Sequence, residues 1–381
     1  MTTLYLVRHA EADGNIYRRV HGQYDGYITP NGERQIALLR ERFANIPVDA
    51  VYASDLYRTR RTATAIYQDK HLALNLAPEL REFHFGVWED LPWGELHLFS
   101  PEEYAVWNAS SPDFAVEGSE TYPIVYARVK EKLDEICAKH PNESVAVVTH
   151  GTVIRALLCG ILFHEDFNRL SDVTWCDNTA VSTIQVENGV YTVIAQNDNS
   201  HLREYSTLEN QRWWRDNEKP EQYNLFFRPA RFPEDLKTLD EYYHSAWVAV
   251  FGCDDYDSAE CTARMKRMLA ADPRAIVFAC RGDETLGSIL LDTRARVVPD
   301  GGHIALLYLE ERYRGKFYAA QLIGHAVSVY RGMGRKWLSV RVAENNKSAR
   351  RFYEKLGFEL TRMERDDQIK QLILRKKIYF E

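Results

Sequence analysis

The chain has 381 residues, of which 45% are hydrophobic and 12% aromatic, which is enough apolar material for two or three packed domains. No apolar run is long enough to span a bilayer, and the start lacks the pattern of a signal peptide, so we expect neither a membrane nor a secreted protein. The six cysteines are scattered without a Cys-x-x-Cys pair, which favours reduced thiols in a cytoplasmic protein over disulfides or a zinc site.

The net charge of −7 is distributed unevenly along the chain. Residues 1–210 carry 18 Lys and Arg against 30 Asp and Glu, whereas the remaining residues carry 30 against 25. A shift of this kind indicates two domains with different partners. The acidic first half argues against nucleic acid as its ligand.

Strand-like runs alternate with helical patterns in the first half. Short β-rich runs predict strands at 4–7, 51–53, 145–148 and 191–194. Apolar periodicity predicts helices at 32–44 and 119–139. This alternation is typical of a doubly wound α/β sheet. It breaks near 204–221, where Trp213-Trp214 and Pro220 stand among polar residues, so we place a first domain at 1–204 and a linker at 205–222.

A second, mixed α/β pattern occupies residues 223–381. Apolar runs predict strands at 225–228, 306–309 and 337–342, with helices up to about 271 and at 317–330. The turn Arg281-Gly282-Asp283-Glu284 lies between two apolar runs and predicts a hairpin over 275–292.

Arginine and histidine side chains follow three predicted strands of the first domain. Arg8-His9 ends the first apolar run, Arg58 follows the second, and His150 ends the run at 145–148. Two guanidiniums match the oxygens of a phosphate dianion, and an unprotonated imidazole can attack phosphorus. Glu82 adds a carboxyl group that can protonate a leaving oxygen and then activate water. Together these residue types predict phosphoryl transfer through histidine.

With these motifs, residues 1–204 resemble the histidine phosphatase (phosphoglycerate mutase-like) superfamily. The resemblance implies that His9 is the phosphorylated nucleophile and that Glu82 is the general acid and base. The residues that would hold the phosphoryl group are Arg8, Asn15, Arg58 and His150. Neither step requires a metal ion.

A mutase must also grip a carboxylate, which in this family is done largely by basic residues after the catalytic glutamate. Residues 90–114 contain no Lys or Arg. Their acidic and aromatic side chains include Asp90, Glu95, Glu102, Glu103, Trp93, Phe99, Tyr104 and Trp107. They either form a wall that favours a neutral, aromatic or cationic leaving group, or simply face solvent. The missing cations favour a phosphatase over a mutase.

A basic turn in the second domain precedes the helix predicted at 317–330. Arg314-Gly315-Lys316 leads into this helix, so free N–H groups and the positive end of the helix dipole are available to an anion. Further along, Asn346 begins a segment that runs through Tyr353 to Gly357-Phe358. A plain solvated helix face is the alternative interpretation of the basic turn.

This combination resembles the GNAT acetyltransferases over residues 223–381. The resemblance implies that the turn binds the pyrophosphate of acetyl-CoA, that Leu307 and Leu309 offer backbone groups to its pantetheine arm, and that Tyr353 protonates the departing thiolate. The residues implied to contact the cofactor are Leu307, Leu309, Arg314, Gly315, Lys316, Phe317, Tyr318, Ala319 and Asn346. Phe317 stands where glycine is usual, which would weaken binding if that position requires a positive φ. Glu310 and His303 are open candidates for the general base.

We therefore expect a cytoplasmic bifunctional enzyme that combines a phosphomonoesterase with an acetyltransferase acting on an amine. Both domains would act on one metabolite family, a phosphorylated amine. Mutase-type phosphoryl transfer is one alternative, and a regulatory protein whose GNAT domain only binds CoA is another. Nucleic acid and membranes are not expected partners, and a homo-oligomer is left open.

Overall fold

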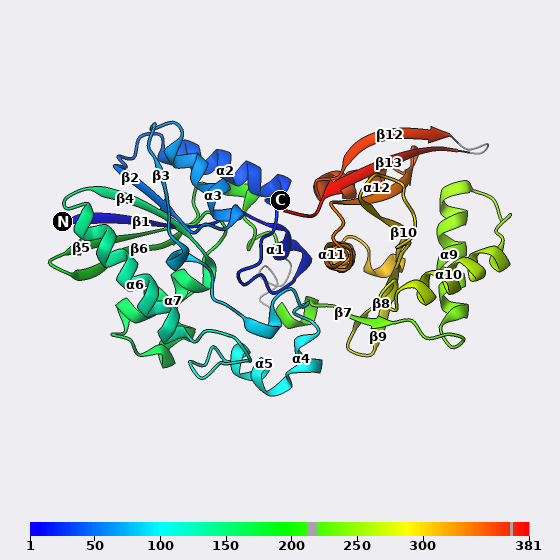
Figure 1. Cartoon of the computed structure of the whole chain (residues 1–381), viewed down its shortest axis with the longest axis horizontal. Coiled ribbons are helices and arrows are strands. Elements are labelled where there is room, and N and C mark those ends of the chain that lie inside the picture. Colours follow the sequence, from blue (N-terminus) through cyan, green and yellow to red (C-terminus); the bar gives the residue numbers. More distant parts are fainter. Residues whose placement is uncertain (212–219, 366–368, 381) are drawn as a thin grey trace. The chain divides into compact units, whose positions relative to one another are not determined.

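The computed structural model describes residues 1–211, 220–365 and 369–380. Trp213 and Trp214 of the predicted linker lie outside the described residues. The chain forms two compact units, one mainly within residues 1–219 and the other mainly within residues 220–381 (Figure 1). Within the described ranges, no helix combines the length and apolarity needed to cross a bilayer.

The first unit is built on a six-stranded sheet with the order β3-β2-β4-β1-β5-β6. Its strands are β1 (Thr2–Arg8), β2 (Ala50–Ala53), β3 (Leu74–Leu76), β4 (Ser144–Thr149), β5 (Val181–Glu187) and β6 (Val190–Asp198). Strands β1 to β4 are parallel, whereas β5 and β6 join the sheet antiparallel. The expected α/β fold is confirmed, but the sheet is mixed, and β5 was not among the predicted strands.

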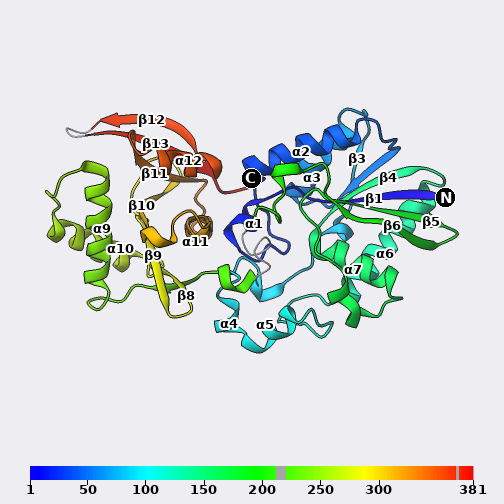
Figure 2. The same cartoon turned by 180° about the vertical axis from the view of Figure 1, so that it is seen from behind.

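Helices cover both faces of this sheet. The helices are α1 (Asp13–Tyr17), α2 (Pro30–Phe43), α3 (Tyr57–Tyr67), α4 (Leu96–Phe99), α5 (Pro101–Asn108), α6 (Tyr122–Lys139) and α7 (Gly151–Leu162), with short 3-10 turns at Pro78–Leu80, Gly86–Trp88, Phe167–Asp172 and Arg203–Tyr205. Helices α2 and α3 lie on one face, and α6 and α7 on the other (Figure 1 and Figure 2). Most of the buried strand residues are Val, Ala and Leu, as is usual for strands that are covered on both faces.

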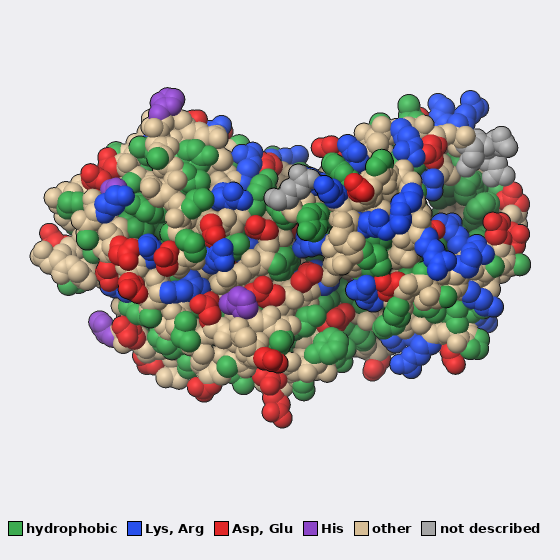
Figure 3. Space-filling view, viewed as in Figure 1, with side chains coloured by type: hydrophobic (Ala, Val, Ile, Leu, Met, Phe, Trp, Pro, Cys, Tyr) green, Lys and Arg blue, Asp and Glu red, His purple; other side chains and the backbone are tan. Residues whose placement is uncertain are grey.

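The second unit contains a seven-stranded sheet with the order β12-β13-β11-β10-β9-β8-β7. Its strands are β7 (Phe226–Pro229), β8 (Ile276–Arg281), β9 (Glu284–Leu291), β10 (Gly301–Leu309), β11 (Trp337–Ala343), β12 (Glu359–Arg365) and β13 (Lys370–Lys377). Its helices are α9 (Leu236–Phe251), α10 (Ser258–Ala271), α11 (Tyr318–Gly332) and α12 (Lys347–Lys355), with 3-10 turns at Pro220–Tyr223 and Glu311–Tyr313. The predicted hairpin is confirmed, since Arg281 pairs with Glu284 across the turn. Figure 3 shows Lys and Arg side chains gathered on the visible face of this unit.

Buried carboxylates anchor residues 205–208 to the first unit. Glu11 is 7% exposed and accepts hydrogen bonds from the hydroxyls of Thr29 (2.6 Å) and Thr207 (2.9 Å). Asp177 is 3% exposed and accepts hydrogen bonds from the Ser206 hydroxyl at 2.5 Å and from two backbone N–H groups of this segment. Buried carboxylates need such donors, because an unpaired buried charge is costly.

Candidate active sites

The carboxyl ends of three parallel strands meet at one edge of the first sheet. Strands β1 and β2 both pair with the intervening strand β4, so the residues that follow them are neighbours. The N–H of His9 donates to the carbonyl of Thr149 at 2.9 Å, and that of Ser54 donates to Val148 at 3.1 Å. His9, Ser54 and His150 therefore lie together, as the sequence predicted for the two histidines.

The His9 ring is held as a neutral imidazole with one nitrogen available. Its Nδ1 lies 2.8 Å from the carbonyl oxygen of Ala10. Because a carbonyl can only accept, Nδ1 carries the proton and Nε2 keeps its lone pair. Burial, together with the charges of Arg58 and Arg8, holds the pKa of His9 well below the usual imidazole value. The ring can therefore act as a nucleophile without first losing a proton.

Two guanidiniums, one buried and one half-buried, lie near this ring, and neither forms an ion pair with a carboxylate within the described residues. Arg58 is fully buried and donates to the carbonyls of Tyr24 (2.8 Å) and Gly22 (2.7 Å). Arg8 donates to the Cys176 carbonyl at 2.5 Å. In the described part of the chain, the Nε atoms of both arginines are buried without a hydrogen-bond partner. Buried cations with unused donors are the environment that an anion would complete.

His150 contributes a third unused donor. Its Nε2 lies 3.0 Å from the hydroxyl of Ser54, and this hydroxyl oxygen already accepts the N–H of Leu56. When the Ser54 hydroxyl donates to Nε2, the ring proton is on Nδ1, which is then a free donor. That Nδ1 is buried and has no partner within the described residues. The His150 and His9 ring centroids lie 5.2 Å apart.

Glu82 is a buried carboxyl group in the connection after the turn at Pro78–Leu80. Its Oε1 accepts the N–H of Phe83 at 2.8 Å, and its Oε2 lies 3.4 Å from the N–H of Thr152 in the first turn of α7. Burial raises the pKa of Glu82, although these N–H groups and Arg58 oppose the shift. A raised pKa suits a group that must hold a proton before it gives it away.

Three further residues shape this site, although the sequence analysis gave them no role there. The Asn178 side chain donates to the carbonyl of His9 at 2.8 Å, and the Thr62 hydroxyl accepts the N–H of Ala10 at 2.8 Å. A Cβ at Gly151 would lie 3.2 Å from Nε of Arg8, so a larger residue there would require this guanidinium to shift. Asn178 and Gly151 act through tertiary contacts, which no local pattern reveals.

One residue of the segment 90–114, Trp107, neither lines a pocket nor faces solvent. Trp107 is 9% exposed and stacks on Tyr122, and together with Phe83, Phe85 and Phe114 it forms an aromatic core. Trp107 is therefore a core residue, and its interpretation as part of a pocket wall is wrong. A cation does reach this segment from elsewhere, because Arg155 of α7 donates to the hydroxyl of Ser110 at 3.0 Å.

Asn15 has a local hydrogen bond in the structure. Its side-chain oxygen accepts the N–H of Ala12 at 2.9 Å, which anchors the start of α1. A phosphate contact through Asn15 would therefore use its amide nitrogen, and this contact stays a prediction.

In the second unit, β10 and β11 diverge after a short stretch of parallel pairing. The two strands pair only from Gly301 to Ile304, whereas β10 continues to pair with β9 as far as Leu309. A register shift at Ile304 to Leu306 marks the point of divergence. Among the described residues, the backbone of Leu307 and Leu309 therefore has no strand partner on the β11 side, although the Leu309 carbonyl accepts Nε of Arg314 at 2.9 Å. The edge fits an extended ligand added in the manner of a strand.

The basic turn before α11 is an open, left-handed turn. Gly315 has φ 72°, and nothing lies within 4 Å of a Cβ built on it. Phe317 has φ 64° and ψ 0° and is 68% exposed, so the position where the family prefers glycine does require a positive φ. The first N–H groups of α11 follow at Tyr318 and Ala319, where a pyrophosphate would fit. The side chain of Tyr318 is itself buried, so this residue could contribute only its backbone.

The remaining predicted residues of this unit are two on or beside α12 and the two candidates for the general base. Asn346 caps α12 by accepting the N–H of Ala349 at 3.0 Å, and Tyr353 is a buried residue of the same helix whose pKa is raised by burial. His303 is buried on β10 and hydrogen-bonds Ser339 at 3.2 Å, while Glu310 accepts hydrogen bonds from Tyr242 and Arg312. The pKa of Tyr353 keeps its hydroxyl protonated, as an acid requires.

Comparisons with known proteins match one family to each unit. The histidine phosphatase superfamily (branch 1) matches residues 4–199, and the acetyltransferase (GNAT) family matches residues 236–358. Phosphoserine phosphatase 1 of Hydrogenobacter thermophilus is 31% identical over 205 residues, which cover 54% of this chain and 96% of that protein. A metal-independent phosphoserine phosphatase of Arabidopsis thaliana is 31% identical over 213 residues, which cover 55% of this chain and 87% of that protein.

Two more similarities concern the first unit alone. A probable phosphoglycerate mutase GpmB of Serratia proteamaculans is 32% identical over 166 residues, covering 42% of this chain and 75% of that protein. Among solved structures, YhfR of Bacillus stearothermophilus aligns with a TM-score of 0.51 and 28% identity, covering 53% of this chain and 100% of its own. The chain belongs to the histidine phosphatase superfamily and carries a GNAT acetyltransferase domain that follows its phosphatase domain in the sequence.

Proposed function

We propose that the first unit hydrolyses phosphomonoesters of small metabolites through a phosphohistidine on His9. The observation that carries this proposal is the neutral His9 ring beside the unused donors of Arg8, Arg58 and His150. Two relatives are named phosphoserine phosphatases, so phosphoserine is the first substrate to test. Phosphoserine also bears an amine, which fits the predicted class of phosphorylated amines.

The reaction would proceed in two steps. Nε2 of His9 attacks phosphorus, the P–O bond to the leaving group breaks, and the proton of Glu82 passes to the leaving oxygen. Arg8, Arg58 and His150 stabilise the charge on the phosphoryl oxygens. A water molecule then attacks phosphorus and gives its proton to Glu82, while the N–P bond breaks and phosphate leaves.

A phosphomonoester panel tests this proposal. Wild type and His9→Ala are assayed for phosphate release from phosphoserine, phosphoethanolamine, sugar phosphates and 3-phosphoglycerate. We expect turnover to be lost in His9→Ala, and rapid quenching of wild type to trap acid-labile phosphate on His9. Activity that survives in His9→Ala would refute the mechanism.

A phosphoglycerate mutase is the second candidate, because GpmB proteins are among the relatives. Two observations weigh against it in this chain: no Lys or Arg lies in residues 90–114, and the Arg155 guanidinium that reaches Ser110 also donates to two backbone carbonyls. Exchange of phosphoryl groups between 2- and 3-phosphoglycerate, dependent on a bisphosphorylated cofactor, would establish the mutase instead.

We further propose that the second unit transfers acetyl from acetyl-CoA to an amine. Bound acetyl-CoA would supply the activated thioester. The turn at Arg314 to Ala319 would hold its pyrophosphate, the free edge of β10 would hold its pantetheine arm, and Tyr353 would keep a proton for the thiolate. Acetyl-CoA binding measured by calorimetry, with thiol release in the presence of amines, tests this. Binding without turnover on any amine would favour the regulatory alternative.

A further inference from the structure

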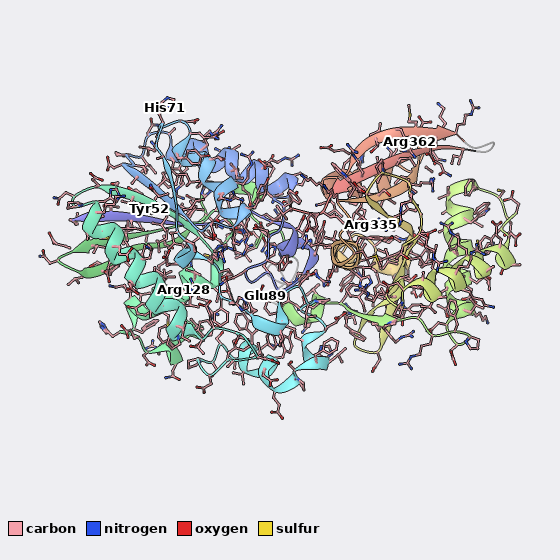
Figure 4. All side chains as sticks on the ribbon, viewed as in Figure 1. Tyr52, His71, Glu89, Arg128, Arg335 and Arg362 are labelled. Atoms are coloured by element: carbon pink, nitrogen blue, oxygen red, sulfur yellow. The ribbon has the colours of Figure 1, made fainter. Side chains whose placement is uncertain are left out.

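Glu82 follows the 3-10 turn Pro78–Leu80 and lies in neither a helix nor a strand. Side chains from elsewhere hold the carbonyls of residues 79–82: Thr149 donates to Leu80, Gln23 donates to Glu82, and Arg128 donates to three of them. Three carbonyls of this segment accept hydrogen bonds from a single guanidinium, that of Arg128 on α6. Arg128 donates to Glu79 (2.6 Å), Arg81 (2.9 Å) and Glu82 (3.1 Å). Figure 4 shows Arg128 on this helix.

Arg128 is itself held in a fixed orientation by Glu120. Its Nε donates to Oε1 of Glu120 at 2.7 Å, and an Nη donates to Oε2 at 2.8 Å, which is the bidentate geometry that orients a guanidinium most strongly. Oε2 of Glu120 also accepts the N–H of His84 at 2.9 Å. The pair therefore holds the chain on both sides of Glu82.

The carboxyl group of Glu82 has weaker fixation of its own. One oxygen bonds the N–H of the next residue, which moves with it, and the other lies 3.4 Å from Thr152, which is long for a hydrogen bond. By contrast, His9 and the phosphate donors lie on or directly after regular elements. Arg8 ends β1 and His9 follows it, Arg58 is in α3, and His150 follows β4. The Arg128–Glu120 pair therefore makes its hydrogen bonds to the segment of the acid, and it reaches His150 only through the charge of Arg128, which a lysine would keep.

We propose that Arg128, oriented by Glu120, is a positioning residue that places the Glu82 carboxyl for proton transfer to the leaving oxygen. This inference rests on the proposed phosphatase function. In the step it serves, the P–O bond breaks as the N–P bond to His9 forms, and the proton of Glu82 ends on the leaving oxygen. Lysine cannot replace Arg128, because an ammonium lacks the planar fork that reaches three carbonyls and a carboxylate together.

Leaving groups of different basicity separate this role from a structural one. p-Nitrophenolate departs without a proton, whereas the alkoxide of an alkyl phosphate such as phosphoserine requires one. The kcat/KM value reports steps up to phosphohistidine formation, so it isolates the acid role of Glu82 from its later role as a base. We expect Arg128→Lys to lower kcat/KM for phosphoserine by about 10-fold or more, and for p-nitrophenyl phosphate by less than about 3-fold.

Three further variants complete the test. Glu82→Gln should show the same selectivity with a larger loss, and Glu120→Gln, which keeps the shape of the partner, serves if Arg128→Lys fails to fold. Arg61→Lys is the matched control, because Arg61 forms a similar bidentate pair with Glu33 between α3 and α2. Arg61→Lys should leave kcat/KM nearly unchanged for both phosphoserine and p-nitrophenyl phosphate.

Equal losses for the two substrates in Arg128→Lys, or no loss, would overturn the proposal, provided that Glu82→Gln shows the selectivity. If Glu82→Gln shows none, or His9→Ala retains activity, then the proposed mechanism itself fails. The two failures are therefore distinguishable.

Discussion

Phe317 allows a direct test of the left-handed turn before α11. An L-residue with φ 64° carries a steric penalty of about 1–2 kcal/mol, because its Cβ approaches the backbone. Glycine avoids this penalty but loses about 0.5–1 kcal/mol more conformational entropy on folding than alanine does. Phe317→Gly and Phe317→Ala lose the same ring, which is 68% exposed. Phe317→Gly should therefore be the more stable variant, by about 0.5–1 kcal/mol.

Urea unfolding of the full chain measures this difference. Two units will not unfold as one two-state system, so the transition of the second unit is assigned as the one that added CoA shifts to higher urea. The free energy of unfolding is then compared between the two variants without CoA, because a difference in CoA affinity would itself change the stability. At an ordinary surface position with a negative φ, alanine would be the more stable of the two. If Phe317→Ala equals or exceeds Phe317→Gly, the positive φ is wrong and so is the glycine-like role of this position.

Three other perturbations follow from described contacts. Gly151→Ala places a methyl group 3.2 Å from Nε of Arg8, so kcat/KM should fall about 10-fold for all phosphomonoesters alike, and a loss confined to one leaving group would contradict this. Because the pKa of Glu82 is raised, kcat/KM for phosphoserine should decline as pH rises through that pKa, and Glu82→Gln should abolish this limb of the pH profile. Burial lowers the pKa of His303 to about 4 from an unfolded value of about 6.5, so the unfolded state takes up the proton first and stability falls with decreasing pH. Between pH 7 and pH 5 this costs about 2 kcal/mol, and His303→Gln should lose that much less in urea titrations at the two pH values.

The residues at the strand ends could be predicted from sequence for a physical reason. Parallel strands place their carboxyl ends at one edge, so Arg8-His9 and His150 had to be neighbours once their runs were recognised as strands. Arg58 and Glu82 were harder, because they lie on a helix and a loop. Their assignment came from the resemblance, and the structure brings both within electrostatic reach of one another.

Other features lay beyond local sequence patterns. The direction of β5 depends on pairing with β1, and an apolar run does not encode strand direction. Trp107 looks the same in sequence whether it lines a pocket or packs in a core. Arg128 lies in a correctly predicted helix, but its contacts with residues 79–82 connect positions nearly fifty residues apart. Such contacts depend on how the elements pack and not on their periodicity.

The anchoring of residues 205–208 bears on where the chain can be cut to study the first unit alone. A fragment ending at residue 204 would lack the Ser206 and Thr207 hydroxyls that bond the buried carboxylates Asp177 and Glu11. Asp177 adjoins Asn178, which holds the His9 carbonyl, and Glu11 follows two residues after His9 itself. Residues 206 and 207 thus stabilise, through these two carboxylates, the chain on both sides of His9 and Asn178. A fragment meant to contain the whole first unit therefore has to extend past residue 208, and a linker to the second unit can begin only after that residue.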